Sequence, residues 1–174
     1  MNLHTSHNWS DVGAATLELS TGEKLIYRCE PELHSIIVHN SDGSVRFAFG
    51  GRGSGPGQFD TPLDVVLVAP EFQGEGLPDE APDAAWLAVA DYGNRRVQIV
   101  DLDGCFIGTI ADPDEDAEPG PPCRLAWRGP TLVVDGVDGT RTVVHLTAAL
   151  LYDSTRYQGE PTELRTQMMS GGTH

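Results

Sequence analysis

The sequence lacks long hydrophobic runs, paired cysteines and a recognisable targeting segment. No stretch approaches the roughly 18 apolar residues that mark a membrane span. Residues 1–7 contain neither the basic region nor the apolar region of a signal peptide. Cys29, Cys105 and Cys123 form no C-x-x-C pair, and their odd count without a secretion signal favours reduced thiols over a disulfide framework. We therefore expect a cytoplasmic protein that has no membrane partner.

Basic residues are also few. The chain has 11 lysine and arginine residues against 26 aspartate and glutamate residues, and its formal net charge is -15. Such a charge repels the phosphates of nucleic acids and anionic lipid headgroups, so we predict that nucleic acid is not a partner. A local basic patch would need several arginines to gather after folding, and their spread along the chain gives no reason to expect it. The arginines concerned are Arg95, Arg96, Arg124, Arg128 and Arg141.

Residues that form turns are abundant. The 20 glycines and 12 prolines interrupt the chain at short intervals, hydrophobic residues make up 39%, and apolar runs that favour helices are scarce. This composition fits many short strands joined by turns. A length of 174 residues suffices for one domain of ordinary size. We predict an all-β fold in which one architecture accounts for nearly the whole chain.

The clearest segment is a predicted meander of four strands. A glycine-rich stretch, residues 53–62, leads into the first strand, and Leu102-Asp103-Gly104 supplies a hairpin turn before the last. Apolar and β-branched residues dominate each strand, and polar residues separate them. The predicted strands are residues 63–68, 85–90, 96–101 and 105–110.

An earlier copy of this segment emerges when Val97 is set over Ile36, an offset of 97 − 36 = 61 residues. A four-stranded repeat usually takes about 40 to 45 residues. Most of the excess belongs to an insert at 70–83, which is proline-rich, acidic and without periodicity, as is typical of a surface loop. The matching positions are Glu30 with Asp91, Asn40 with Asp101, Asp42-Gly43 with Asp103-Gly104 and Phe49 with Ile110.

A third, weaker copy has strand-like stretches at 123–128, 131–135, 142–146 and 150–155, and Arg141 precedes Val143 as arginines precede Val97. Units of this size bury their apolar faces against their neighbours. Four-stranded antiparallel units in series indicate about three blades of a β-propeller. We predict an N-terminal extension at 1–13, blades at 14–50, 51–110 and 121–155, and a disordered C-terminal tail at 156–174.

Two motifs of the middle unit carry a family resemblance. Residues 55–66 read Gly-Pro-Gly-Gln-Phe-Asp-Thr-Pro-Leu-Asp-Val-Val, and residues 89–104 read Val-Ala-Asp-Tyr-Gly-Asn-Arg-Arg-Val-Gln-Ile-Val-Asp-Leu-Asp-Gly. Together they resemble one full NHL repeat, over residues 53–110. The first copy is degenerate, because Leu33 and His34 stand at the Asn94 and Arg95 positions, and the third copy is poorer still.

The resemblance implies a structural role for the residues at the motif positions of the repeat. Asp91, Asn94 and Arg95 are similar to family residues that tie strands together within a blade, and a buried carboxylate held by arginine and backbone donors would stabilise the turn. The structural repeat motif comprises Asp91, Asn94, Arg95, Val97, Asp101 and Gly104.

The resemblance also raises the question of ring closure. NHL propellers commonly have six blades, whereas this chain supplies about three. An open ring exposes two blade faces, and apolar patches of that size are uncommon on soluble monomers. Two copies could close a ring head to tail as a homodimer. The alternative is an open fragment that another propeller segment completes.

The sequence offers no complete metal site. Residues 112–118 carry carboxylates at alternate positions, like the start of a calcium loop, but Ala117 stands where glycine is needed and Cys123 where a chelating glutamate is needed. We interpret this run as a solvated loop. The histidines show no ligand spacing with one another or with cysteine. They are His4, His7, His34, His39, His145 and His174.

The sequence also offers no catalytic or cofactor motif. G-x-S-x-G, Walker and dinucleotide-binding patterns are absent, and the glycines of 51–57 lead into a predicted strand, so no helix N-terminus faces a phosphate. We therefore predict no catalytic, cofactor-binding or metal residues and no cofactor. The leading hypothesis is a non-catalytic scaffold module that binds a protein partner through its propeller loops. The alternatives are a metal-dependent lyase or hydrolase with its site in a completed channel, and an RNA-binding NHL propeller, which the net charge disfavours.

Overall fold

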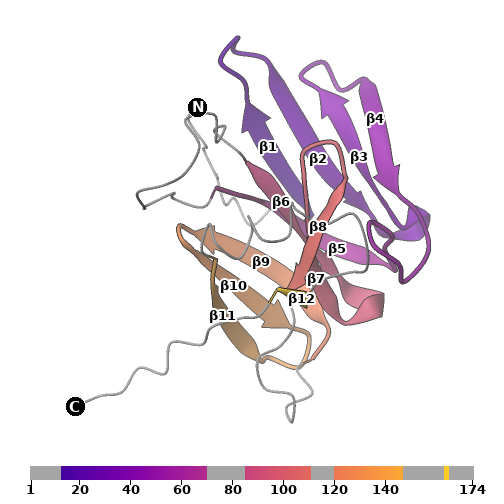
Figure 1. Cartoon of the computed structure of the whole chain (residues 1–174). Coiled ribbons are helices and arrows are strands. Elements are labelled where there is room, and N and C mark those ends of the chain that lie inside the picture. The colour runs from indigo at the N-terminus through magenta and orange to yellow at the C-terminus, as the bar shows by residue number, and fades with distance from the viewer. Residues whose placement is uncertain (1–12, 70–84, 111–119, 147–162, 165–174) are drawn as a thin grey trace.

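A computed structural model describes residues 13–69, 85–110, 120–146 and 163–164 (Figure 1). These residues form β-strands joined by turns and two short 3-10 helices. The predicted all-β class is therefore confirmed. No helix in these four ranges is long and apolar enough to cross a membrane. The predicted insert at 70–83, the carboxylate run at 112–118 and, apart from residues 163–164, the predicted tail lie outside the described residues.

The first sheet is a meander of four antiparallel strands in the order β1-β2-β3-β4. Its side chains alternate between a buried face and an open face: Leu25, Tyr27 and Cys29 are buried, whereas Lys24 and Arg28 are exposed. One face of this sheet is therefore packed against the rest of the molecule. The strands are β1 (Ala14–Glu18), β2 (Lys24–Glu30), β3 (Ser35–Asn40) and β4 (Val45–Gly50).

The second sheet repeats this meander, and its inner strands are buried on both faces. Every residue of β6 is buried, which is the pattern of a strand that lies between two other layers. A two-residue strand, β12 (Glu163–Leu164), adds to its edge in parallel with β8. The meander strands are β5 (Pro62–Val68), β6 (Trp86–Asp91), β7 (Arg96–Val100) and β8 (Phe106–Ile110).

The third sheet has three described strands, β9 (Pro122–Arg128), β10 (Thr131–Gly136) and β11 (Arg141–His145), in the order β11-β10-β9. Both pairings are antiparallel. The fourth strand that we predict at 150–155 lies outside the described residues.

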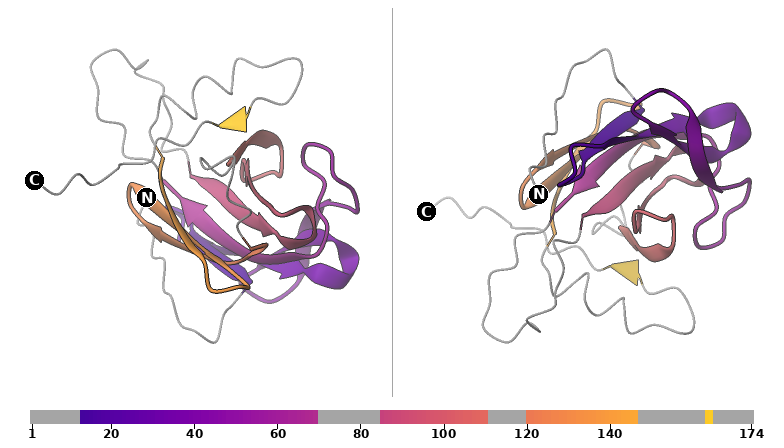
Figure 2. Two further views of the ribbon diagram at one scale, coloured as in Figure 1. Left: turned by 90° about the horizontal axis from the view of Figure 1, so that it is seen from below. Right: turned by 90° about the horizontal axis from the view of Figure 1, so that it is seen from above.

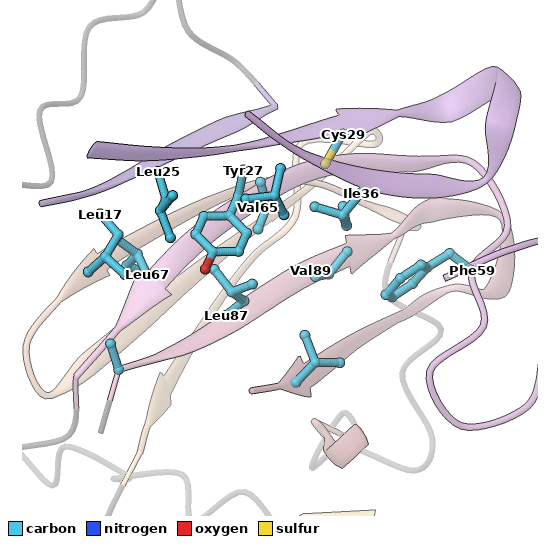
Figure 3. Close-up of a cluster of buried hydrophobic side chains, with 13 residues drawn as sticks. Leu17, Leu25, Tyr27, Cys29, Ile36, Phe59, Val65, Leu67, Leu87 and Val89 are labelled. Carbon is cyan, nitrogen blue, oxygen red and sulfur yellow. The ribbon is translucent and has the colours of Figure 1, made fainter. Parts of the chain in front are cut away.

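The three sheets pack face to face, with the second sheet in the middle (Figures 1 and 2). The first strand of each sheet faces inward, because β5 packs against both β1 and β9. One apolar core lies between the first and second sheets and includes Tyr27, Phe59 and Leu87 (Figure 3). A second core, which includes Ile99 and Leu132, lies between the second and third sheets. None of the three sheets closes on itself.

The backbone reproduces the predicted offset between the first and second sheets. In the first, β2 ends in the 3-10 helix η1 (Pro31–Leu33), and His34 follows in the left-handed region with φ 52°. In the second, β6 ends in η2 (Tyr92–Asn94), and Arg95 follows with φ 55°. His34 and Arg95 are 95 − 34 = 61 residues apart, the offset that the sequence predicts.

Hairpin turns of one kind recur in all three sheets. In each, the fourth residue donates a backbone hydrogen bond to the first, and the first donates to the fifth. The fourth residue is always a glycine with φ between 83° and 89°, a conformation that disfavours other residues. The predicted match of Asp42-Gly43 with Asp103-Gly104 is therefore seen as the same turn. The turns span residues 19–23, 40–44, 101–105 and 136–140.

The third sheet corrects one predicted correspondence. Its register shifts at Pro122 and Arg124 in the same way as the second sheet's register shifts at Pro62 and Asp64. Arg141 then pairs with Asp135 as Val97 pairs with Ala90. Arg141 therefore stands at the Val97 position itself, and the predicted match with the arginines before Val97 is wrong. The sequence hid this because the hairpin at 136–140 replaces the 3-10 turn of the other two sheets.

Candidate functional site

A buried carboxylate organises the polar end of the second sheet. Asp91 is fully buried at the end of β6. Its Oδ1 accepts a hydrogen bond from the backbone N–H of Asp60 at 2.7 Å. Its Oδ2 accepts from Asn94 Nδ2 at 2.9 Å, Arg96 Nε at 2.8 Å and Gln98 Nε2 at 3.2 Å. Four donors thus compensate the burial of one negative charge.

The partners of Asp91 continue into the linker that connects the first two sheets. Arg96 donates to the carbonyls of Ser54 at 2.8 Å and Gly55 at 3.0 Å, and Asn94 donates to the carbonyl of Gly53 at 2.8 Å. Gln98, also fully buried, completes the network: its side chain accepts from the N–H of Gly57 at 3.0 Å and donates to the carbonyl of Gln58 at 2.6 Å. The two halves of the motif, residues 53–60 and 91–98, therefore fold together as one hydrogen-bonded unit.

The predicted motif residues do not gather at one place. Asp91 and Asn94 meet in this network, and Arg95 occupies the left-handed position after η2. Val97 lies in the core. Asp101 and Gly104 lie in the β7–β8 turn, where the Asp101 carboxylate accepts from the N–H groups of residues 103 and 105.

Sequence reasoning missed two members of the network, Gln98 and the arginine that pairs with Asp91. The ion pair comes from Arg96, at 2.8 Å, one residue after the arginine we singled out. Strand alternation could have found it, because Arg96 and Gln98 are two residues apart and extend to the same side of β7. Gln98 carried no signal beyond its polarity within an apolar run.

A second buried carboxylate, Asp64, joins all three sheets. It lies in β5, and its Oδ1 accepts from the N–H of Gly13, at the start of the first sheet, at 3.0 Å. Its Oδ2 accepts from the N–H of Leu125 in the third sheet at 2.8 Å. One side chain therefore fixes the inner strands relative to one another. Asp64 is not among the residues predicted for the structural motif.

His34 fastens the first sheet to the same linker. Its Nδ1 accepts from the N–H of Thr61 at 3.1 Å, and its carbonyl accepts from the N–H of Gly51 at 2.9 Å. The Asp60 Oδ1 atom lies 3.3 Å from the same ring nitrogen. His34 thus holds the end of the first sheet to the segment that leads into the second sheet.

The connections between second and third strands gather at one end of the molecule, which we call the turn end. It comprises η1, η2 and the hairpin at 136–140. The N–H of Gly93 donates to the carbonyl of Asp60, and the N–H of Val137 donates to the carbonyl of Pro121, so η2 and the hairpin are tied to the chain that enters the neighbouring inner strands. The turn end exposes two large apolar side chains, Leu33 at 62% and Val137 at 53%.

The three thiols differ in exposure, but none is favoured as a thiolate. Burial raises the pKa of Cys29 well above its usual range, and burial is also the main cause of a raised pKa at Cys123. The exposed Cys105 has a raised pKa chiefly because the Asp101 carboxylate lies beside it. A thiol with a raised pKa is a poor nucleophile near neutral pH.

Metal ligands do not converge in the part of the chain that the structure describes. Within those ranges no three His, Cys, Asp or Glu side chains are placed to hold a metal ion. The predicted carboxylate run at 112–118 lies outside them.

The negative charge is unevenly distributed. The described residues contain 13 acidic and 9 basic side chains, and the remaining segments contain 13 acidic and 2 basic ones. The sheets themselves are therefore close to neutral. Contrary to our expectation from the sequence, three of the five arginines gather: Arg124, Arg128 and Arg141 lie on one face of the third sheet.

These features define an all-β protein of serial antiparallel sheets that are joined by buried polar ties. A comparison with models of protein families finds no match, and a comparison with curated proteins finds no similar sequence.

Proposed function

We propose that the chain is a partial NHL-type β-propeller that works as a non-catalytic scaffold and binds a protein partner through the turn end. One observation carries this proposal: the apolar side chains of Leu33 and Val137 are exposed on loops whose backbones are fixed by hydrogen bonds. Exposed apolar side chains on preorganised loops lose little conformational entropy on binding, which is the property of an anchor residue.

The fold supports the propeller interpretation in three respects. The sheets are serial meanders, their first strands lie innermost, and each packs face to face with the next (Figure 2). This is the arrangement of neighbouring propeller blades. The network around Asp91 then corresponds to the tie that the resemblance to NHL repeats implies.

The surroundings of the two anchors suggest the partner's chemistry. Glu32 is exposed beside Leu33, and Asp138 is exposed beside Val137. We expect the partner to present apolar side chains flanked by basic ones. Arg95, directly after η2, is also exposed and adds a positive charge to the turn end.

The test compares three forms of the chain as bait for proteins from the source cell. One is unchanged, one carries Leu33→Asp with Val137→Asp, and the control carries Val45→Asp. Val45 is 62% exposed, as Leu33 is, but lies beside the turn at 40–44, at the opposite end of β3. We expect the unchanged chain and the control to capture the same partner in equal amounts. The double variant is expected to capture about 10-fold less of that partner. Equal capture by all three would contradict binding through the turn end.

A further inference from the structure

The chain contains four Asp-Gly dipeptides, at residues 42–43, 103–104, 135–136 and 138–139. Three of them lie in the five-residue hairpin turns described above, and the one at 135–136 ends β10. In each of the three turns, the glycine has a positive φ and its N–H donates a hydrogen bond to the carbonyl of the turn's first residue. The three backbones are therefore matched, and the turns differ in their side chains.

An Asp-Gly dipeptide can rearrange with water as the only reagent. The glycine nitrogen attacks Cγ of the protonated aspartate, a bond forms between the two atoms, and the carboxyl hydroxyl leaves with the amide proton as water. Water then opens the five-membered imide that results. If it breaks the bond from the nitrogen to the original backbone carbonyl carbon, the product is isoaspartate, whose main chain runs through Cβ and Cγ. A hydrogen bond that stabilises the carboxylate therefore slows the reaction, because the ionised group does not lose its oxygen as hydroxide.

Three of the four aspartates are held in the ionised form by donors. Asp42 Oδ1 accepts from the N–H of Ser44 at 2.9 Å and from its hydroxyl at 2.6 Å. Asp138 Oδ1 accepts in the same way from the threonine two residues later, at 3.0 Å and 2.6 Å. Arg141 donates to both carboxylate oxygens of Asp135. In each case the side-chain hydrogen bond is the main cause of a lowered pKa of the aspartate.

Asp103 differs, although its turn has the same backbone. It is exposed, and within the described ranges no group donates a hydrogen bond to its carboxylate. Asp101, the first residue of this turn, accepts from the N–H groups of residues 103 and 105 at 3.0 Å and 2.8 Å. Cys105 stands where the other two turns have serine and threonine, and its thiol also lies beside Asp101. The donors that hold the aspartate in the other turns are thus directed to Asp101 here.

We propose that isoaspartate forms selectively at Asp103, and that the folded structure suppresses it at the other three Asp-Gly dipeptides. The site lies at the contact between the first two sheets. Tyr27 donates its hydroxyl hydrogen to the carbonyl of Leu102 at 3.2 Å, and a Cβ at Gly104 would overlap the ring of Phe49. Isoaspartate adds one carbon to the main chain between these two contacts, so at least one of them must shift. The modification is therefore expected to loosen the first sheet from the second.

The test incubates the folded, full-length chain at neutral pH and physiological temperature. The water lost in the first step is regained in the second, so the mass of the chain does not change. Chromatography of peptides with electron-transfer mass spectrometry distinguishes isoaspartate from aspartate at each dipeptide. We expect isoaspartate to accumulate at Asp103 about 5-fold or more faster than at each of the other three, a factor that corresponds to the loss of one hydrogen bond to a charged group.

The same chain in urea is the reference. Unfolding removes the hydrogen bonds of the turns and leaves the four Asp-Gly sequences unchanged, so the four rates are expected to become similar. A lead of the same size for Asp103 in urea would show that neighbouring residues in the sequence, and not the folded turn, cause the selectivity. That result would overturn the proposal.

Two variants exchange the side chains of the matched turns. The double variant Asp101→Asn with Cys105→Ser gives this turn the polar residues of the turn at 40–44, and isoaspartate at Asp103 is expected to form as slowly as at Asp42. Ser44→Ala is expected to raise the rate at Asp42. Loss of the fold would accelerate the reaction, so it cannot account for slowing in the double variant. Isoaspartate that appears first at another dipeptide, or a rate at Asp103 that the double variant does not lower, would contradict the proposal.

Discussion

The first and second sheets make the same turn from different side chains. Both turns contain a 3-10 helix and a left-handed residue, at His34 and at Arg95. Only the second has a buried carboxylate at its start, Asp91, whereas Glu30 at the same place in the first is partly exposed. The backbone of the turn therefore does not depend on the polar network. What the network holds is the linker at 53–60, since most of its outer partners lie there.

The largest expected effect is the difference in unfolding free energy between variants at Asp91 and at Glu30. Asp91→Ala leaves Arg96 and Gln98 without their shared acceptor, and breaking a buried ion pair from one side costs about 3 to 5 kcal/mol of unfolding free energy. Glu30→Ala, the matched control, is expected to change it by about 0.5 kcal/mol or less. Urea denaturation of both variants measures the difference. Similar losses would show that the two turns depend equally on their carboxylates.

The hairpin glycines provide a second matched pair. Gly43 and Gly104 both have positive φ, but a Cβ at Gly43 would meet nothing, whereas a Cβ at Gly104 would overlap the ring of Phe49. We expect Gly43→Ala to cost about 1 kcal/mol through backbone strain. Gly104→Ala adds overpacking at the contact between the first two sheets, about 1 to 3 kcal/mol more. Thermal unfolding of both variants measures the two losses of stability. Equal losses would contradict the close approach of Phe49 to Gly104.

The inter-sheet tie at Asp64 has a smaller expected effect. Asp64→Ala leaves the N–H groups of Gly13 and Leu125 without their acceptor, and unsatisfied buried donors cost about 1 to 3 kcal/mol. The readout is hydrogen exchange, in which those two amides should lose protection. Asp42→Ala is the control, because Asp42 accepts from Ser44 within a single exposed turn. Unchanged exchange at both amides would show that the sheets are held by their cores alone.

The smallest effect is expected at the exposed pair of the third sheet. The hydrogen bond from Arg141 lowers the pKa of Asp135, so the pair stabilises the fold above the usual pKa range of aspartate and ceases to do so as pH falls through the lowered value. Arg141→Gln should cost less than about 1 kcal/mol at neutral pH. NMR titration should show the pKa of Asp135 rising in this variant, and an unchanged pKa would contradict the assignment.

The repeat was predictable from sequence because its signals are local. The turn glycines and the alternation of apolar residues lie within a few residues of one another, so the offset between Ile36 and Val97 survived the loss of the polar motif. The side chains that join segments were less accessible. Asp64 bonds to Gly13 and Leu125, partners 51 and 61 residues away, and no local pattern encodes them.

The faces of the third sheet were misjudged for a related reason. A strand's alternation shows which residues share a face, but register with the neighbouring strand decides which rows form across a sheet. Arg124 and Arg141 are 17 residues apart in sequence and meet in one row only because both strands pair with β10. Their gathering became visible only with that pairing.

The serial order of strands has a consequence for synthesis on the ribosome. Nearly every strand pairs with its neighbour in the chain, so each sheet can begin to form as it emerges. The apolar face of the first sheet, however, is covered by side chains as late as Val100 and Leu102. About half of the polypeptide must therefore leave the exit tunnel before Tyr27 and Ile36 are shielded from water, and a nascent chain that stalls earlier presents that face to chaperones.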